Sequence, residues 1–196
     1  METLERGPSS PSDEAETVVL VDDRNRPLGQ APKETVHTGD TPLHRGFSVF
    51  LFDRRGRLLL QQRSHRKKTW PLVWSNSCCG HPRLGETSLD AARRRLAFEL
   101  GVRPTEIVEL LPDFRYRATR CGVTENELCP VMVAFTSDQP VPNPDEVEAV
   151  RWVDWPRFVA ETRRHPERYS EWCVEETQLL AGDDRLRSLL AALSSS

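Results

Sequence analysis

The side chains in this sequence that are best suited to chemistry lie in residues 70–102. A thiol and an imidazole, Cys79 and His81, stand two residues apart in a loop of small and polar residues. Two carboxylates follow: Glu86 lies in the same loop, and Glu99 lies near the end of a predicted helix. A thiol, an imidazole and two carboxylates on one loop–helix unit predict a metal-assisted acid/base site.

The composition limits the class of protein. The chain has 196 residues, 37% of them hydrophobic, and a formal net charge of −3. We expect a disordered tail over residues 1–15, which are rich in Ser, Pro and Glu, and a single domain over residues 16–196. The negative charge argues against non-specific nucleic-acid binding. The first residues lack a secretory signal, and no apolar run is long enough for membrane insertion.

Cysteine usage favours a reduced, cytoplasmic protein. The five cysteines are an odd number, two of them are adjacent, and none forms a CxxC pair. A disulfide framework or a thiol zinc knuckle is therefore not expected.

The elements that position these residues are predicted as a mixed sheet with helices on its faces, an α/β sandwich. Apolar spacing, Thr87 as a cap and Gly101 as a stop predict a helix over Ser88–Leu100. Strands are predicted over 17–21, 27–30, 47–52, 57–63, 107–111, 114–118, 128–135 and 149–153. A helical turn is predicted over 32–36, and further helices after Asp154, after Ser170 and over 185–193. The segments that hold His37 and Cys79 are predicted as loops.

The segment after the thiol resembles the Nudix box. The matching positions are Gly80, Glu86, Arg94, Leu96, Glu99, Gly101 and Val102. Arg95 and Phe98 depart from it, because the box has Glu at both positions. In Nudix hydrolases those acids complete a metal cluster, so their absence argues against pyrophosphate hydrolysis.

The flanking motifs resemble type 1 isopentenyl diphosphate isomerase over residues 18–180. They are His37-Thr, Leu43-His44, Lys-Lys-Thr-Trp-Pro at 67–71, Trp-Ser-Asn-Ser-Cys-Cys-Gly-His-Pro at 74–82, Asp-Phe-Arg-Tyr-Arg-Ala-Thr at 113–119 and Glu-Asn-Glu-Leu-Cys-Pro at 125–130. The resemblance implies a Nudix-like fold and isomerisation of isopentenyl diphosphate to dimethylallyl diphosphate, a step of isoprenoid biosynthesis. It also implies that Cys79 and Glu127 are opposed acid/base groups, and that Tyr116 hydrogen-bonds the Glu127 carboxylate.

The resemblance further implies two metal sites. Glu125 and Glu127 stand two apart, which places both carboxylates on one face of a strand. With His37, His44 and His81 they would bind a divalent ion, Mn²⁺, Mg²⁺ or Zn²⁺. Glu99 and the main-chain oxygen of Cys79 would bind a Mg²⁺ that bridges the diphosphate.

The substrate contacts are implied in the same way. Lys33, Arg63 and Lys67 resemble the residues that hold the diphosphate, and Trp172 resembles the tryptophan that faces a cationic intermediate.

Each residue also has a simpler interpretation. A cytosolic cysteine is commonly buried and inert, a Glu-x-Glu pair commonly lies on a solvated strand edge, and a basic loop or a packed tryptophan is common. The roles of Cys78 and Glu86 stay open.

Two rival functions remain at this point: a Nudix pyrophosphohydrolase, and a diphosphate-binding module without catalysis. We expect a monomer that acts on a small isoprenoid diphosphate and does not bind nucleic acid. The sequence does not fix the direction of each proton transfer or the segment that closes over the substrate.

Overall fold

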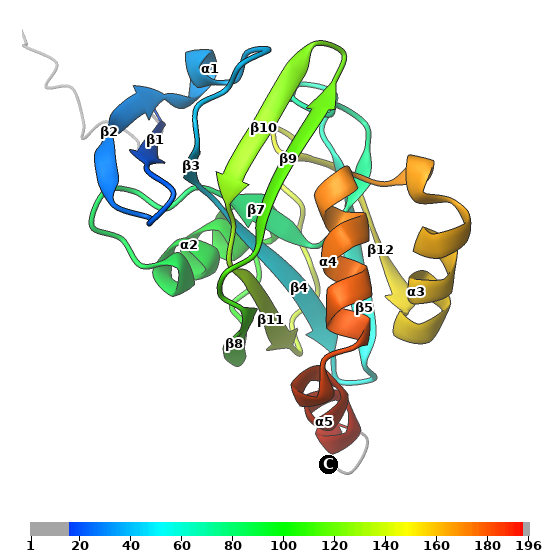
Figure 1. Ribbon diagram of the computed structural model, residues 1–196. Coiled ribbons are helices and arrows are strands. Elements are labelled where there is room, and N and C mark those ends of the chain that lie inside the picture. The colour runs from blue at the N-terminus through cyan, green and yellow to red at the C-terminus, as the bar shows by residue number, and fades with distance from the viewer. Residues whose placement is uncertain (1–15, 194–196) are drawn as a thin grey trace, which may run out of the picture.

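The computed structural model describes residues 16–193 (Figure 1), so the tail expected over residues 1–15 lies outside the described part. The strands are β1 (Thr17–Val21), β2 (Pro27–Pro32), β3 (His44–Arg45), β4 (Phe47–Asp53), β5 (Arg57–Arg63), β6 (Trp74–Ser75), β7 (Cys78–Gly80), β8 (Glu106–Leu111), β9 (Arg115–Arg120), β10 (Val123–Leu128), β11 (Val131–Thr136) and β12 (Val147–Asp154). The helices are α1 (Lys33–Val36), α2 (Ser88–Leu100), α3 (Trp155–Arg164), η1 (Pro166–Arg168), α4 (Glu171–Ala181) and α5 (Asp184–Leu193).

The strands form two mixed sheets rather than one. The first has the order β2-β1-β3-β10-β9, and the second has the order β12-β5-β4-β11-β8, with β6 added to β5 and β7 added to β4. In the second sheet β4 and β11 run parallel, while their other neighbours are antiparallel. The predicted combination of mixed sheet and helices is therefore confirmed.

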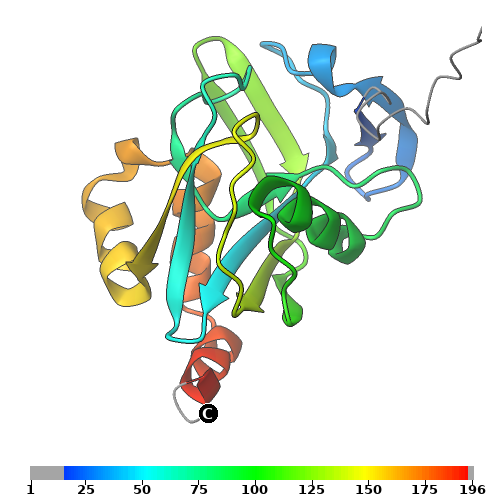
Figure 2. The same cartoon turned by 180° about the vertical axis from the view of Figure 1, so that it is seen from behind.

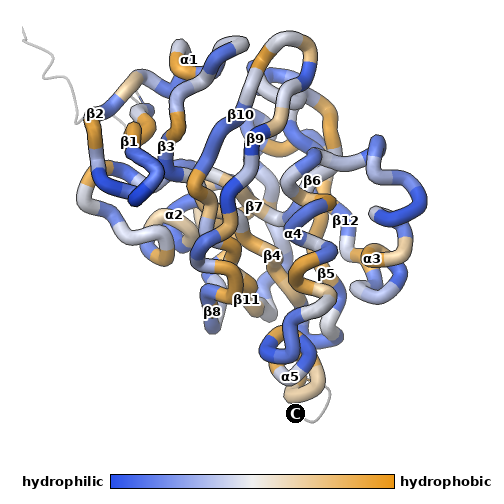
Figure 3. Tube along the Cα trace, viewed as in Figure 1, coloured by the Kyte–Doolittle hydropathy of each residue, from blue (hydrophilic) through white to orange (hydrophobic). Residues whose placement is uncertain are grey.

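The second sheet is buried on both faces. Helix α4 lies across the face seen in Figure 1, and α2 lies across the opposite face, which Figure 2 shows from behind. Alternate residues of β4 pack into two separate cores: Phe50 on the α4 side, and Val49 and Leu51 on the α2 side. Figure 3 shows β4 and β11 in the hydrophobic colour. This near-continuous apolar run is what a strand covered on both faces requires.

The strands β4 and β5 begin as the predicted hairpin and then separate. They pair at Phe52 and Leu58, next to the turn. Farther from the turn, β7 pairs with β4 and β6 pairs with β5, so residues 74–80 lie between the two strands. The Ser77 hydroxyl accepts a hydrogen bond from the Leu51 amide at 2.7 Å and donates one to the Leu59 carbonyl at 2.6 Å. One side chain thus satisfies two backbone groups that separation of the strands leaves unpaired.

Helix α2 has the predicted bounds and end signals. The Thr87 hydroxyl accepts a hydrogen bond from the Asp90 amide at 3.1 Å. Gly101 ends the helix with a φ of 64°, a conformation that glycine adopts at little cost. The buried residues Ala92, Leu96 and Leu100 face the sheet, as their spacing predicts.

Other sequence predictions are corrected by the structure. The strand predicted over 128–135 starts too early, because β10 ends at Leu128 and β11 begins at Val131; from Val131 onward the prediction is confirmed. Pro130, which has no amide proton for a ladder, lies in the break. The segments predicted as loops contain the short strands β3, β6 and β7, which depend on partners far along the chain. None of the helices within residues 16–193 has both the length and the apolar character that a bilayer span requires.

Candidate active site

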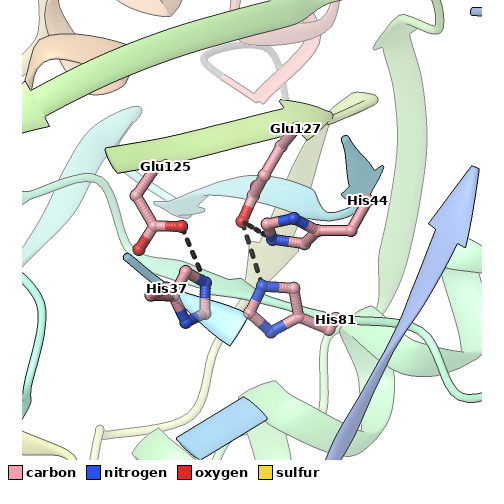
Figure 4. A group of neighbouring side chains, drawn as sticks. All are labelled: His37, His44, His81, Glu125 and Glu127. Atoms are coloured by element: carbon pink, nitrogen blue, oxygen red, sulfur yellow. Dashed lines mark hydrogen bonds and ion pairs between the residues drawn. The ribbon is translucent and has the colours of Figure 1, made fainter. Parts of the chain in front are cut away.

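Five side chains from four separate segments meet beside the first sheet (Figure 4). Glu125 and Glu127 project from one face of β10, as their spacing predicts. His44 lies on β3, directly opposite Glu127 in the parallel pairing of the two strands. His37 ends α1, and His81 follows β7. The structure therefore brings together every residue predicted for the histidine–carboxylate metal site.

The geometry of this cluster is that of a cation site. One ligand atom from each of the five residues lies within 4.8 Å of all the others. Nε2 of His37 is 2.9 Å from Glu125 Oε2. Nε2 of His44 and Nε2 of His81 are 3.4 Å and 3.0 Å from Glu127 Oε1. Imidazole and carboxylate are ligands that Zn²⁺, Mn²⁺ and related divalent ions accept.

The hydrogen bonds behind the cluster fix two of the imidazoles. Nδ1 of His44 is 2.9 Å from the Pro42 carbonyl, and Nδ1 of His37 is 3.2 Å from the Lys33 carbonyl. Each Nδ1 therefore carries the proton, because a carbonyl can only accept. A neutral ring in that tautomer points the lone pair of Nε2 at a carboxylate, which is favourable only with a cation between them. Both Nε2 atoms are buried without a hydrogen-bond partner, so the residues present fit a divalent ion.

The pKa shifts within the cluster reflect the negative charge of the Glu127 carboxylate. Burial raises the pKa of Glu127, but hydrogen bonds and charge from His44 and His81 outweigh burial and hold it well below its usual range. Burial lowers the pKa of His81 to about 4 despite the opposing effect of Glu127. Burial also lowers the pKa of His44, but Glu127 outweighs it and the net shift is upward. Ionised Glu127 thus lies in a pocket that favours a positive partner.

Gly46 makes room for the cluster. A Cβ at this position would lie 1.9 Å from Oε2 of Glu127, far inside van der Waals contact. Sequence reasoning missed this residue, because its signal is a close approach between two strands and not a motif. A side chain larger than that of glycine at position 46 would displace the Glu127 carboxylate.

A cavity of about 520 Å³ opens next to the cluster. Cys79 and Glu127 both line it, which is the geometry that an opposed acid/base pair requires. The other predicted site residues on its wall are Lys33, His37, Arg63, Lys67, His81, Tyr116, Glu125 and Trp172. Of the predicted set, His44 lies behind the wall in the cluster, and Glu99 is not among the lining residues.

Cys79 is held by two buried polar side chains. It lies directly opposite Ser48 in the pairing of β4 and β7, with 3.3 Å between Sγ and Oγ. The Cys79 thiol donates a hydrogen bond to Oδ1 of Asn76 at 3.2 Å. Burial raises the pKa of Cys79 to about 12. Cys78 is fully buried in the core on the α2 side, which agrees with a packing role.

Two aromatic residues line the cavity beside the thiol. Nε1 of Trp172 donates to Oδ1 of Asn76 at 3.2 Å, which fixes the ring, and the Arg63 guanidinium lies 5.8 Å from the ring centre. Tyr116 is paired with Glu127 across β9 and β10, and its ring lies 5.4 Å from that of Trp172. Among the described residues, the Tyr116 hydroxyl makes no hydrogen bond to Glu127, so that predicted contact is not formed here.

Two of the basic residues predicted to hold the diphosphate, Lys33 and Lys67, belong to a second charged cluster, which we call the basic network. Its members are Lys33, Lys67, Arg95, Glu16, Glu99 and Glu146. Glu16 pairs with Lys33 and, at 2.9 Å, with Arg95, while Glu146 pairs with Lys67 and, at 3.2 Å, with Arg95. Arg95, a departure from the Nudix box, is thus the centre of the network. Burial and the nearby Arg63 and Lys33 lower the pKa of Lys67 despite the opposing acids.

Glu99 and Glu86 each pair with an arginine. The Glu99 carboxylate lies 2.6 Å from Arg95, and its side chain is 2% exposed. A guanidinium rather than an open coordination position faces this carboxylate, so the structure gives no support for the predicted magnesium site. Glu86 binds Arg94 and the backbone amide of Arg83, which agrees with the loop-supporting role considered for it.

Sequence reasoning missed several residues of the site. Asn76 is fully buried and bonds Cys79, Trp172 and Ser48, yet it resembles any polar loop residue in the sequence. Its position within the Trp-Ser-Asn-Ser-Cys-Cys motif was the available signal. Ser48 lies inside an apolar strand, where a lone hydroxyl is a cue for a buried hydrogen bond.

Replacing Gly46 by Ala should displace the Glu127 carboxylate and weaken metal binding. Because changes beside a metal ligand commonly cost 10- to 100-fold in affinity, we expect about tenfold or more. Titration of the metal-free protein with Mn²⁺ by calorimetry measures this. Gly39→Ala is the matched control, since a Cβ there would lie an ordinary 3.5 Å from the nearest atom. Equal affinities in the two variants would refute the steric role of Gly46.

The basic network should make stability depend on acid pH. Burial raises the pKa of Glu16, but Lys33 and Arg95 outweigh burial and lower it to about 2, from 4.5. Between these values the unfolded chain binds more protons, so the free energy of unfolding falls as pH falls from about 5 to 2. Urea unfolding across this range should show a shallower fall for Glu16→Gln than for the wild type. Parallel curves would show that the two ion pairs contribute nothing.

Comparison with known proteins identifies the family of the chain. The NUDIX domain matches residues 42–173. The isopentenyl-diphosphate Delta-isomerase of Saccharopolyspora erythraea is 49% identical over 162 residues, 82% of this chain and 84% of that protein. The isopentenyl-diphosphate Delta-isomerase of Frankia alni is 47% identical over 189 residues, 96% of each chain.

Solved structures share the fold at low sequence identity. DR0079 from Deinococcus radiodurans has a TM-score of 0.58 and 22% identity, covering 76% of this chain and 90% of that one. The MutT protein from Methanosarcina mazei has a TM-score of 0.55 and 14% identity, covering 72% and 97%. These two likenesses concern the fold alone. The extent and identity of the sequence matches show that the chain belongs to the isopentenyl-diphosphate Delta-isomerase family and carries a NUDIX domain.

Proposed function

We propose that this enzyme isomerises isopentenyl diphosphate to dimethylallyl diphosphate, with Cys79 and Glu127 as the opposed acid/base groups. Its relatives are named for isomerisation of isopentenyl diphosphate. The observation that carries the assignment of residues is the shared cavity, since both side chains line one space of about 520 Å³. A thiol and a carboxyl group that face one small substrate are what a double-bond shift needs.

The reaction sets three demands on the chain. One alkene carbon gains a proton while the neighbouring methylene loses one, so an acid and a base must reach different carbons of the same substrate. The developing tertiary cation must not meet water. Trp172 meets part of this demand, because its buried ring borders the cavity and an indole face attracts positive charge without acting as a nucleophile. Tyr116 excludes water from the same side.

The diphosphate would bind to Arg63, Lys67 and Lys33. All three line the cavity, and Arg offers paired donors while Lys offers a point charge. The pKa of Lys67 is lowered first by burial and then by the positive charge of Arg63 and Lys33, and an arriving anion would offset that charge. Substrate binding would compete with Glu16 and Glu146 for these cations.

The histidine–carboxylate cluster would hold one divalent ion through His37, His44, His81, Glu125 and Glu127, and we propose Mn²⁺, Mg²⁺ or Zn²⁺. When bound, the ion supplies positive charge between the two carboxylates and lowers the basicity of Glu127. A Mg²⁺ at Glu99 is suggested only by the family resemblance, because Arg95 occupies that carboxylate here.

We further propose that the enzyme acts as a monomer in the cytoplasm, with a small isoprenoid diphosphate and not nucleic acid as its ligand. All five cysteines are free, which suits a reducing compartment. The basic side chains that line the cavity are engaged with acids or backbone carbonyls rather than arrayed with exposed aromatic platforms.

A single assay separates isomerisation from hydrolysis. Purified protein incubated with isopentenyl diphosphate and Mg²⁺ should yield dimethylallyl diphosphate without free phosphate. The reason is that Arg95 and Phe98 replace two acids of the Nudix box, and Phe98 is 52% exposed and carries no ligand atom. Release of phosphate or pyrophosphate without isomer would favour the pyrophosphohydrolase, and absence of both products would favour a binding module.

Removing either member of the pair should abolish isomerisation and leave the fold intact. Cys79→Ala and Glu127→Gln should each lower kcat by about a hundredfold or more, the usual contribution of a positioned acid or base. Cys121→Ser, at an exposed cysteine outside the cavity, is the matched control and should keep full activity. Near-normal turnover by Cys79→Ala, or deuterium uptake from D₂O at the wild-type rate by Glu127→Gln, would exclude that residue from the pair.

A further inference from the structure

Glu176 is a fully buried carboxyl group for which the site described so far has no use. It lies on α4, the helix that covers one face of the second sheet (Figure 1), and it is 0% exposed. Its Oε2 lies 2.8 Å from the Ser48 hydroxyl, while its Oε1 is buried without a hydrogen-bond partner. A buried carboxyl group with a hydrogen-bond partner for only one of its two oxygens calls for an explanation.

The register of the sheet joins Glu176 to the thiol. Ser48 alternates with Val49 along β4, so it shares the α4-facing side with Phe50. On β7, Cys79 is the direct partner of Ser48. A continuous chain of contacts therefore runs from Glu176 through the Ser48 hydroxyl, at 2.8 Å and then 3.3 Å, to Sγ of Cys79.

The surroundings of Glu176 favour its neutral form. Among the described residues, no Lys, Arg or His forms an ion pair with it, and an isolated buried carboxylate is costly. Burial raises its pKa well above the usual range despite the hydrogen bond from Ser48, and the nearby charges of Glu127 and Glu175 raise it further. A neutral carboxyl group carries a proton, and it can donate that proton to Ser48 rather than accept one.

The hydrogen bonds around Ser48 then leave one direction for its own proton. Its oxygen accepts from Nδ2 of Asn76 at 3.0 Å. Oε2 of Glu176 lies 2.8 Å away; Ser48 donates to this oxygen when the carboxylate is charged and accepts from it when a neutral acid is protonated there. A hydroxyl has two acceptor sites and one donor, so the remaining proton points at the third neighbour, the Cys79 sulfur. The thiol proton in turn is directed at Oδ1 of Asn76. With a charged Glu176 the Ser48 proton would turn away from the sulfur.

We propose that Glu176, as a neutral buried acid, is a positioning residue that directs the Ser48 hydroxyl at the sulfur of Cys79. Ser48 then holds the sulfur in its orientation and stabilises negative charge that develops there during proton transfer. Glu176 itself touches neither the cavity nor the substrate, since it is absent from the cavity wall. This inference rests on the proposed acid/base role of Cys79.

Two substitutions at position 176 separate the neutral acid from a charged one. The amide of Glu176→Gln donates a hydrogen bond as the neutral acid does, so this variant should keep nearly full activity. Glu176→Leu fills the space without a donor. This variant loses the hydrogen bond between position 176 and the Ser48 hydroxyl, so Ser48 is no longer held against the Cys79 sulfur. We expect kcat to fall about fivefold to tenfold, with KM nearly unchanged because no substrate contact is lost. Glu175→Leu, at the exposed neighbour on the same helix, is the matched control.

A second readout does not depend on turnover. In a Cys121→Ser background, the rate of Cys79 alkylation by iodoacetamide, followed by mass spectrometry, reports how the sulfur is held. Cys78, Cys129 and Cys173 are buried and compete little. Glu176→Leu should alkylate several-fold more slowly than the wild type at one fixed pH, and Glu176→Gln should match the wild type. Ser48→Ala should show the same loss as Glu176→Leu, which keeps the test decisive if the Leu variant folds poorly.

The outcomes are distinct. Wild-type kcat and alkylation in Glu176→Leu, or in Ser48→Ala, would overturn the positioning role. Equal losses in Glu176→Gln and Glu176→Leu would show that the charge or a transferable proton of the carboxyl group is needed, which contradicts a role confined to positioning Ser48. Full turnover by Cys79→Ala would refute the proposed function instead, and the alkylation rates would still report whether Glu176 controls the sulfur.

Discussion

The separation of β4 and β5 is the constraint on which the rest of the site depends. Two strands that separate inside a covered sheet expose backbone amides and carbonyls that water cannot reach, and each unpaired group costs free energy. The segment 75–77 removes that cost. Ser77 bridges the backbones of Leu51 and Leu59, and Nδ2 of Asn76 donates to the Val49 carbonyl at 3.1 Å. The polar residues of this segment therefore stabilise the sheet, whatever part they also have in the chemistry of the site.

The same hydrogen bonds determine where the reactive groups lie. Because residues 74–80 must run between the strands to satisfy them, β7 pairs with β4, and Cys79 comes to lie opposite Ser48. The other polar atom of the Asn76 side chain, Oδ1, accepts hydrogen bonds from both Cys79 and Trp172. One buried amide therefore fixes the thiol and the indole ring relative to each other. Proton transfer requires groups held at fixed relative positions, and these hydrogen bonds supply that constraint.

This dependence explains which features the sequence reveals. The bounds of α2 and β5 follow from signals within the segment itself, such as the cap at Thr87 and the glycine at 101. The histidine–carboxylate cluster was assigned by family resemblance, because nothing local in the chain joins His37 to Glu125. Burial and pairing between distant residues are invisible locally. Ser48 and Glu176, for example, are 128 positions apart.

The two charged clusters differ in a way that bears on how the substrate is oriented. In the basic network, each of Lys33, Lys67 and Arg95 already has a carboxylate partner, so an anion can enter by exchanging one negative group for another. In the histidine–carboxylate cluster, the ion-pair partners of Glu125 and Glu127 among the described residues are imidazoles rather than Lys or Arg, so the permanent charge is negative. A diphosphate can therefore replace a carboxylate in the basic network, whereas the histidine–carboxylate cluster repels it unless a cation intervenes. Under the proposed function, the phosphates would bind the basic residues, and the uncharged hydrocarbon end would occupy the space that Cys79, Glu127 and Trp172 line.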